Sequence, residues 1–276
     1  MGDVFGKPGR AMINKYLNRI KSKYSVDLVI ANVENAAHGK GVTPKILNQL
    51  MQAGVDFFTL GNHSWHKHEF LDSIFHNYSN IVRPLNLSED FKYHNLGVGT
   101  KALKVKDINI RVTNLLGNSV HFRQRQSNCF LCFSSLLDNL SREKKMEEIH
   151  LVDLHSETTS EKNAFLWAFN GRVSAVLGTH THVPTNDAVI TEEKTAYISD
   201  VGMTGPSCGI IGGERTSIIQ KFFYPELKFM LQPQEGAAQF CSVLISFNRE
   251  NYSPVKIKPI ILREGYFFDD YKLHSV

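Results

Sequence analysis

The sequence predicts a layered α/β protein built as a single domain over residues 1–276. Short apolar runs alternate with helical patterns along the first 200 residues, as in folds whose strands are separated by helices. Three further segments alternate apolar and polar residues with a period of two, which is typical of half-buried antiparallel strands. Hydrophobic residues make up 42% of the chain, enough for a sizeable core. We therefore expect a mixed or two-sheet core.

Helices are predicted where apolar residues recur at helical spacing, over residues 11–23 and 44–53. The second helix has a clear start, because Thr43 is a candidate N-cap and Pro44 suits the first turn. Apolar runs predict strands at 28–31, 55–60, 149–154, 174–177 and 196–199. The period-two pattern adds strands at 109–116, 238–247 and 256–262.

The charge of the chain is nearly balanced, with 31 Lys and Arg against 27 Asp and Glu and a formal net charge of +4. Both signs mix along the chain, and the charged segment 141–148 is typical of a solvated helix face rather than a nucleic-acid-binding stripe. No window approaches the ~20 consecutive apolar residues of a membrane helix, and the first ten residues lack the apolar centre of a signal peptide. We expect a soluble cytoplasmic protein without a membrane partner or a stable nucleic-acid complex.

The four cysteines do not predict a zinc or redox site. Cys129 and Cys132 have the CxxC spacing, but the residues between them are Phe and Leu, and a zinc knuckle needs two further ligands nearby. Cys208 and Cys241 stand alone in the sequence. We expect all four to be reduced thiols, as is usual in a cytoplasm.

Polar side chains that can bind metals follow the predicted strands at the points where those strands end. In an open α/β sheet, ligands bind outside the carboxyl ends of the strands. The residues expected to converge at this edge are Asp3, Glu34, Asn35, Asn62, His63, His155, His180 and His182.

The donor atoms of this set are nitrogen and oxygen, with no thiolate. Carboxylate, amide oxygen and imidazole suit Mn, Fe or Zn, and the lack of thiolate argues against a closed structural zinc site. His180 and His182 can reach two adjacent ions from one turn, and Glu34 offers a carboxylate that can bridge them. The sequence therefore predicts a pair of metal ions at this edge of the sheet.

Several stretches resemble a known family. Gly2-Asp3, Gly61-Asn62-His63 and the run Thr-His-Thr-His at 179–182 resemble the calcineurin-like metallophosphoesterase superfamily. The longer stretches 34–41, 153–162 and 200–206 are similar to the YmdB branch of bacterial phosphodiesterases, especially its mycoplasma versions. This resemblance covers nearly the whole chain.

The resemblance implies a four-layer α/β/β/α sandwich with two metal ions, and it implies a role for each site residue. Glu34 would bridge both ions. The first ion would also be held by Asp3, Asn35 and His182, and the second by Asn62, His155 and His180. His63 would stand beside the substrate as the proton donor. The family's activity is the hydrolysis of 2′,3′-cyclic and 3′,5′-cyclic nucleotides.

The sequence departs from the superfamily pattern at two places. The superfamily begins Asp-x-His, but Phe5 stands at the third position here, and we expect Asn35 to take over the role of that His. The family also places an apolar strand of about five residues before Gly-Asp, whereas only Met1 precedes Gly2. We therefore expect the first β-strand to be missing and Asp3 to be held less rigidly.

The implied mechanism is attack on phosphorus by a hydroxide shared between the two ions, with proton donation by His63. We expect two divalent or trivalent ions per chain, Fe or Mn first, with Zn or Mg as alternatives. A phosphomonoesterase or nucleotidase would use the same ligands and stays open. So does a catalytically weak module that senses a cyclic nucleotide, although a binding module needs no proton donor. The sequence is compatible with a homo-oligomer and does not establish one.

Overall fold

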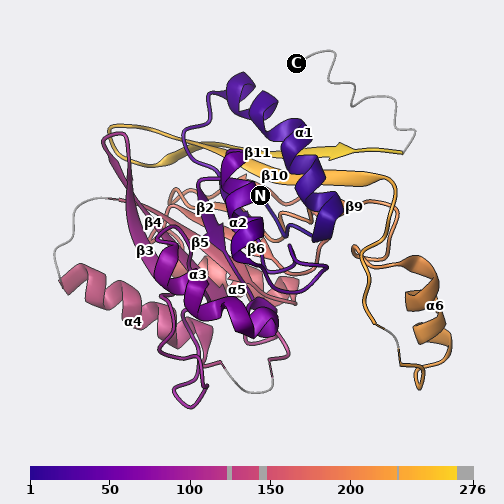
Figure 1. Ribbon diagram of the computed structural model, residues 1–276. Coiled ribbons are helices and arrows are strands. Elements are labelled where there is room, and N and C mark those ends of the chain that lie inside the picture. The colour runs from indigo at the N-terminus through magenta and orange to yellow at the C-terminus, as the bar shows by residue number, and fades with distance from the viewer. Residues whose placement is uncertain (123–125, 143–147, 229, 266–276) are drawn as a thin grey trace.

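The computed structural model of the chain describes residues 1–122, 126–142, 148–228 and 230–265 (Figure 1). Its helices are α1 (Gly6–Tyr24), α2 (Pro44–Gln52), the 3₁₀ helix η1 (Ser64–Phe70), α3 (Leu71–Asn77), α4 (Cys129–Arg142), α5 (Thr159–Phe169) and α6 (Arg215–Phe223). Its strands are β1 (Ile30–Asn32), β2 (Phe57–Thr59), β3 (Thr100–Val105), β4 (Ile108–Leu116), β5 (Ile149–His155), β6 (Ala175–Thr179), β7 (Val189–Ile190), β8 (Ala196–Ile198), β9 (Gly205–Pro206), β10 (Ala238–Phe247) and β11 (Pro254–Arg263). The helices predicted at 11–23 and 44–53 and all of the predicted strands are confirmed to within about five residues, whereas most of the charged segment 141–148 lies outside the described residues.

The larger sheet has the strand order β3-β4-β5-β6-β8-β7. Its inner strands β4, β5, β6 and β8 run parallel, and β3 and β7 pair antiparallel at the edges. The burial of β5, β6 and β8 explains why the sequences of these three inner strands are mostly apolar runs. Strand β4, predicted from its period-two pattern as a half-buried antiparallel strand, is instead buried over most of its length and pairs parallel with β5 as well as antiparallel with β3. Because these strands are parallel, His155 at the end of β5 and Thr179 at the end of β6 lie side by side.

The remaining strands form a parallel pair, β1-β2, and a three-stranded group, β11-β10-β9. The first residues of the chain lie between these two groups. Val4 N–H donates to Asn32 O at 2.9 Å on one side, and Thr204 N–H donates to Asp3 O at 2.9 Å on the other. An isolated parallel bridge joins Val4 to Thr204. These contacts place the Asp3 side chain between the two strand groups.

A cavity of about 410 Å³ lies beside Met1, between β1, β10 and the larger sheet. Its walls are mostly apolar and include Leu17, Phe240 and Leu244. The Met1 amino group donates a hydrogen bond to Ile30 O at 2.6 Å. Burial lowers the pKa of this amino group to about 6, although nearby carboxylates oppose the shift.

Helices α1 and α2 pack on the two smaller groups of strands, and α4 and α5 pack on the larger sheet. Apolar side chains of α1 and α2, such as Met12, Leu17 and Leu47, pack with those of β1, β2 and β10 in one buried cluster. Side chains of α4 and α5, such as Phe133 and Phe165, pack against β4, β5, β6 and β8 in another. The structure confirms a mixed α/β fold, and the four-layer order stays a prediction.

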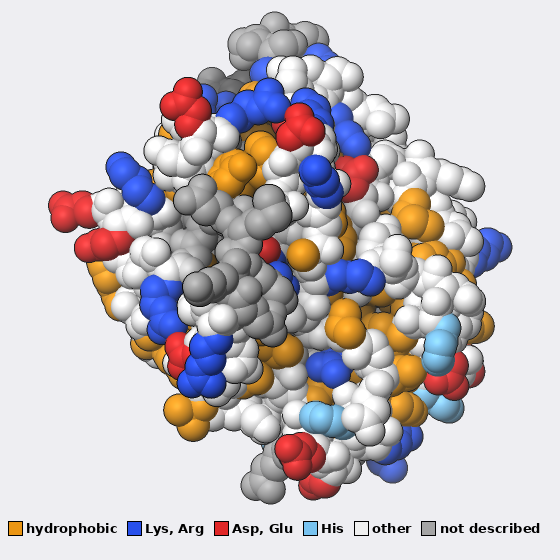
Figure 2. Space-filling model, turned by 90° about the vertical axis from the view of Figure 1, so that its left-hand side faces the viewer, with side chains coloured by type: hydrophobic (Ala, Val, Ile, Leu, Met, Phe, Trp, Pro, Cys, Tyr) orange, Lys and Arg blue, Asp and Glu red, His pale blue; other side chains and the backbone are white. Residues whose placement is uncertain are grey.

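Helix α6 stands apart from this core, at the right of Figure 1, and none of its residues is buried. Phe222 and Phe223 at its end are 80% and 75% exposed. Over the face drawn in Figure 2, Lys and Arg side chains are interspersed with Asp and Glu. None of the described helices combines the length and apolarity that a membrane crossing requires.

Candidate metal centre

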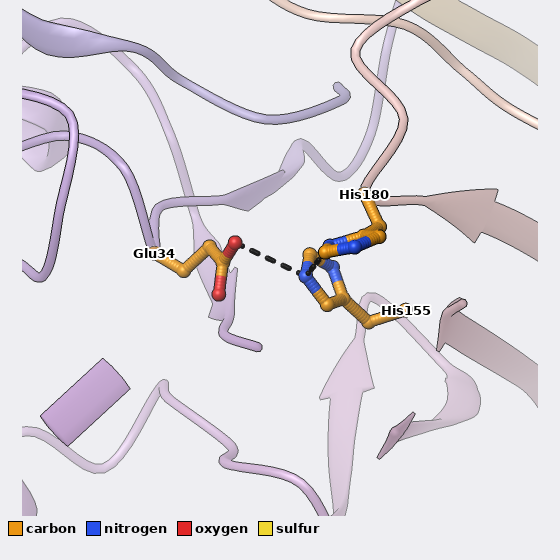
Figure 3. Close-up of side chains that lie close together, drawn as sticks. All are labelled: Glu34, His155 and His180. Atoms are coloured by element: carbon orange, nitrogen blue, oxygen red, sulfur yellow. Dashed lines mark hydrogen bonds and ion pairs between the residues drawn. The ribbon is translucent and has the colours of Figure 1, made fainter. Parts of the chain in front are cut away.

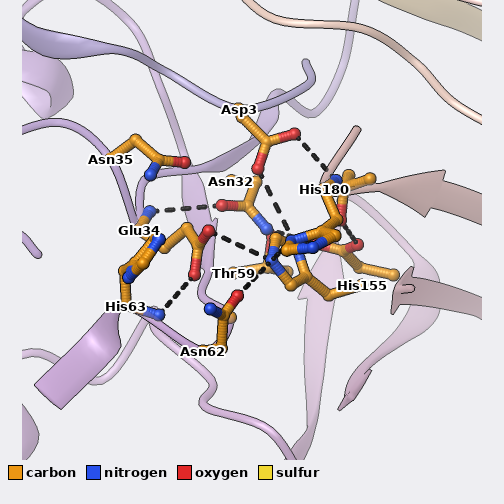
Figure 4. A network of polar contacts seen from close by, with 12 residues as sticks. Asp3, Asn32, Glu34, Asn35, Thr59, Asn62, His63, His155 and His180 are labelled. Atoms are coloured by element: carbon orange, nitrogen blue, oxygen red, sulfur yellow. Dashed lines mark hydrogen bonds and ion pairs between the residues drawn. The ribbon is translucent and has the colours of Figure 1, made fainter. Parts of the chain in front are cut away.

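The eight polar residues expected at the strand ends meet in the structure. Glu34 and Asn35 follow β1, Asn62 and His63 follow β2, and His155 ends β5. Figure 4 shows these side chains converging from the larger sheet and from the segments that follow β1 and β2. The network includes Asp3, Glu34, Asn35, Asn62, His63, His155 and His180, and His182 lies beside it.

The centre of the cluster is Nε2 of His155, which faces three potential metal ligands. Glu34 Oε1 lies 3.0 Å from this nitrogen, Asn62 Oδ1 lies 3.1 Å away, and His180 Nδ1 lies 2.9 Å away. Figure 3 shows the Glu34, His155 and His180 side chains pointing toward one another. The ligand atoms of these three residues all lie within 4.8 Å of one another, as a shared ion requires.

A second group of donors surrounds Nε2 of His182. Asn35 Oδ1 lies 3.3 Å from this nitrogen, and Asp3 Oδ1 lies 4.0 Å from it. The Asn35 amide is oriented because its Nδ2 donates to Gly39 O at 2.8 Å. The Phe5 ring packs edge-on against the His182 ring, with centroids 5.5 Å apart. Phe5 therefore supports this ligand group instead of contributing a donor to it.

Two of the histidines are held by hydrogen bonds on their outer nitrogens. His182 Nδ1 lies 2.7 Å from Ile211 O, and a carbonyl oxygen accepts only, so Nδ1 carries the proton and Nε2 is free for a metal. His180 Nε2 lies 2.8 Å from Glu157 Oε2, which likewise leaves His180 Nδ1 facing the site. Sequence analysis missed Glu157, although it follows the strand-end His155 by two residues.

The turn that carries His180 and His182 has an unfavourable backbone. Their φ angles are 99° and 68°, in a region where non-glycine residues cost on the order of 1–3 kcal/mol each. The carboxylate of Asp200 holds the turn between them, accepting from Thr181 N–H at 3.0 Å and from Thr181 Oγ1 at 2.7 Å. Lys162 Nζ, fully buried, lies 2.9 Å from the same carboxylate oxygen. Sequence analysis assigned no role to this buried pair.

Gly61 allows the backbone to pass close to the ligands. A Cβ atom at this position would lie 2.3 Å from Glu34 Oε2 and 2.5 Å from His155 Nε2. Any side chain at this position would therefore displace the Glu34 and His155 side chains. The Gly-Asn-His triplet thus has a steric reason for its glycine.

His63 lies beside the centre and touches it through its backbone. Its N–H donates to Glu34 Oε2 at 2.8 Å, while its ring packs against His66 with centroids 4.9 Å apart. Among the described residues, no partner hydrogen-bonds to His63 Nδ1, although that atom is buried. Burial lowers the pKa of His63 to about 4, with Glu34 opposing the shift.

The charged forms of Glu34 and His155 stabilise each other. Burial alone would raise the pKa of Glu34, but the charge and hydrogen bond of His155 outweigh it and hold the pKa below its usual range. Burial alone would lower the pKa of His155, but Glu34, with help from Asp3 and Asp153, raises it to about 9. The negative charge around His155 therefore favours a positive charge at this point of the cluster.

For Asp3 and His180, burial outweighs the effect of neighbouring charges on the pKa. Burial raises the pKa of Asp3 to about 6, with His182 and His155 opposing the shift. Burial also lowers the pKa of His180 to about 3, and the neighbouring His155 adds to this. A neutral His180 is the form that binds a metal.

The residues present fit a metal centre by their own chemistry. Asp3 Oδ1 is buried, and no hydrogen-bond partner for it is found among the described residues, which is costly unless a cation compensates. The donors are carboxylate, amide oxygen and imidazole, as hard-to-borderline cations prefer. All four cysteines are free thiols and lie outside this cluster.

The sequence family described as YmdB-like protein matches residues 1–260. The chain belongs to this family. It is 41% identical over 275 residues, 98% of this chain and 95% of the relative, to a protein of Mycoplasma genitalium named as a candidate phosphatase/phosphodiesterase. It is 40% identical over 268 residues, 97% of each chain, to the 2′,3′-cyclic-nucleotide 2′-phosphodiesterase of Bacillus subtilis.

A solved structure described as a novel phosphatase of Mycoplasma pneumoniae matches with a TM-score of 0.89 and 40% identity, covering 95% of this chain and 91% of that one. These likenesses show a metallophosphoesterase-type protein. The chain is a phosphoric ester hydrolase. Its family implies divalent metal ions, and the cluster around His155 has the residues to bind them.

Proposed function

We propose that the chain is a di-metal phosphodiesterase that hydrolyses cyclic nucleotides, 2′,3′-cyclic monophosphates, 3′,5′-cyclic monophosphates or both. The observation that carries the proposal is the convergence of three donors, from Glu34, Asn62 and His180, on His155 Nε2 within 3.1 Å. The choice of substrate is supported by the name of the Bacillus subtilis relative, which is 40% identical over almost its whole length.

The proposed ligands form two groups, and the contacts around His155 Nε2 and His182 Nε2 support this division. Glu34 would bridge the ions, Asn62, His155 and His180 would complete one site, and Asp3, Asn35 and His182 the other. We propose Fe or Mn as the ions, with Zn or Mg as alternatives, since all four accept nitrogen and oxygen donors. When bound, a pair of such ions supplies positive charge to the phosphoryl oxygens and lowers the pKa of water toward neutrality.

His63 is the proposed proton donor to the leaving ribose oxygen. Its neutral ring would gain a proton when the negative phosphodiester binds beside it, because the added charge favours the imidazolium. Its backbone N–H holds Glu34, and that contact survives any change of the side chain. His63→Ala should therefore lower turnover by about 10²–10⁴-fold while leaving the metal content unchanged.

The test loads purified protein with Mn²⁺ or Fe²⁺, measures metal per chain, and follows hydrolysis of bis-p-nitrophenyl phosphate. His155→Ala should lose metal and activity together, whereas His63→Ala should lose activity alone. Equal turnover of wild type and His63→Ala would remove the proton-donor assignment. A wild-type protein that binds none of Fe, Mn, Zn and Mg would remove the metal centre.

A second candidate is a phosphomonoesterase, because the mycoplasma relatives are named as phosphatase/phosphodiesterase and the ligand set suits both reactions. Assays with 2′,3′-cyclic AMP and with 3′-AMP separate the two activities. Release of inorganic phosphate from 3′-AMP, with 2′,3′-cyclic AMP left intact, would favour the monoesterase. Tight binding of the cyclic nucleotide with negligible turnover would favour a sensing module.

A further inference from the structure

A buried carboxylate, Asp153, lies behind His155 and has no part in the proposed reaction. Its oxygens accept hydrogen bonds from Asn32, Thr59 and Thr179, which belong to three other strands. We propose that Asp153 and Thr179 are positioning residues that hold His155 with its proton on Nδ1 and its Nε2 free for a metal ion. This inference rests on the metal centre of the proposed function.

The contacts form a relay of two hydrogen bonds. Thr179 Oγ1 lies 2.7 Å from Asp153 Oδ1 and 2.8 Å from His155 Nδ1. A hydroxyl has one proton, and an ionised carboxylate can only accept. When Thr179 donates its proton to Asp153, its oxygen must accept from His155, so Nδ1–H is the donor.

The direction of this relay depends on Asp153. The other ligand histidines face pure acceptors, since His182 contacts the Ile211 carbonyl and His180 contacts the Glu157 carboxylate. The Thr179 hydroxyl alone can donate or accept, so by itself it would allow either tautomer of His155. The carboxylate behind it removes that freedom.

The same carboxylate also supports Glu34. Asp153 Oδ2 accepts from Asn32 Nδ2 at 3.0 Å, which turns the other end of that amide toward the Glu34 backbone. Asn32 Oδ1 then accepts from Glu34 N–H at 3.2 Å. Figure 4 shows Asn32 and Thr59 within this network, behind the ligands. Asp153 thus orients two ligands, His155 at the end of β5 and Glu34 after β1, which belong to different sheets.

The decisive variant is Thr179→Val, which keeps the shape of the side chain and removes the hydroxyl. Loss of such an outer partner typically lowers metal affinity 10–100-fold, and we expect that loss for Zn²⁺ measured against a chromophoric chelator. Thr179→Ser restores a hydroxyl and should bind within a few-fold of wild type. Asp153→Asn, which replaces the pure acceptor, should lose affinity as Thr179→Val does.

A matched control is Thr113→Val in β4. Thr113 is also buried, and its hydroxyl lies 2.8 Å from a ring nitrogen of His150, which stands near the start of β5, at the opposite end of the strand from His155, and outside the cluster. This variant loses an equivalent buried hydroxyl–imidazole contact, so we expect lower stability with unchanged Zn²⁺ affinity. An equal drop in affinity for both variants would mean that general destabilisation explains the effect, and the relay would be wrong.

The wild-type protein gives an independent readout that does not depend on any variant folding. In the Zn²⁺-loaded, ¹⁵N-histidine-labelled protein, His155 should show an Nδ1–H proton protected from solvent exchange, with a contact to the Thr179 methyl group. Absence of that proton overturns the relay. Wild-type protein that binds none of Zn²⁺, Mn²⁺ and Fe²⁺ overturns the proposed metal centre, whereas tight Zn²⁺ binding by both wild type and Thr179→Val overturns the relay alone.

Discussion

Lys162→Met removes a buried positive charge while keeping most of the side-chain volume, and we expect it to destabilise the protein strongly. Lys162 and Asp200 are 0% and 1% exposed, with 2.9 Å between Nζ and Oδ2. Removing one partner of a buried pair costs about 3–5 kcal/mol, because the other charge stays buried. Asp200 keeps its bonds from Thr181 and Gly202, so we expect a value of about 3 kcal/mol, at the lower end.

The assay is urea unfolding of the metal-free protein, with the free energy of unfolding compared between variants. The matched control is Lys106→Met, since Lys106 forms an ion pair with Asp27 in which the side chains are 62% and 57% exposed. Such exposed pairs contribute about 0–1 kcal/mol. If Lys162→Met costs no more than Lys106→Met, the buried pair does not stabilise the turn of His180 and His182 as argued.

Three further outcomes follow from the described contacts. The pKa of His150 is lowered to about 3 by burial, with Arg111 adding to the shift, so below its unfolded pKa of about 6.5 only the unfolded chain takes up a proton. As the pH is lowered from 6.5 to 3, His150 should therefore lower the free energy of unfolding by about 1.4 kcal/mol per pH unit. His150→Gln should remove this contribution, which corresponds to close to one proton in the pH dependence of unfolding. Gly61→Ala, whose methyl group would overlap two ligand atoms, should lower Zn²⁺ affinity more than tenfold in chelator competition, and unchanged affinity would contradict the close packing. Burial raises the pKa of Cys129 and Cys241 to about 12, so neither should react with a thiol reagent at pH 8 until urea unfolds the chain; rapid labelling of the native protein would refute this.

Elements with strong local signals were predictable from the sequence. Helix α2 begins where Thr43 and Pro44 indicated, and Thr43 Oγ1 accepts from Ile46 N–H at 3.4 Å. Helix α6 was not predicted, although Ile218, Ile219, Phe222 and Phe223 recur at helical spacing, and the structure buries none of them. Strand β3 was also missed, since it lies at a sheet edge with half-exposed, mixed residues.

The meeting of the candidate ligands was predictable because parallel strands bring their carboxyl ends together, whatever their distance in sequence. The residues behind the ligands were not. Asp153 contacts Asn32 across 121 positions of sequence, and Lys162 contacts Asp200 across 38. The first pair depends on how β1 faces β5, and the second on how α5 packs against the larger sheet, and local patterns encode neither.

The candidate ligands come from the larger sheet and from the smaller groups of strands, and they span nearly two thirds of the chain. This spread has a consequence for folding. His180 N–H donates to Asp3 Oδ2 although the two residues are 177 positions apart. Contacts between such distant residues form after local structure, because the entropy of closing the intervening chain must be overcome first. Competence to capture a cation would therefore arise late in refolding, and the time course of metal uptake would report when the two halves of the molecule have docked.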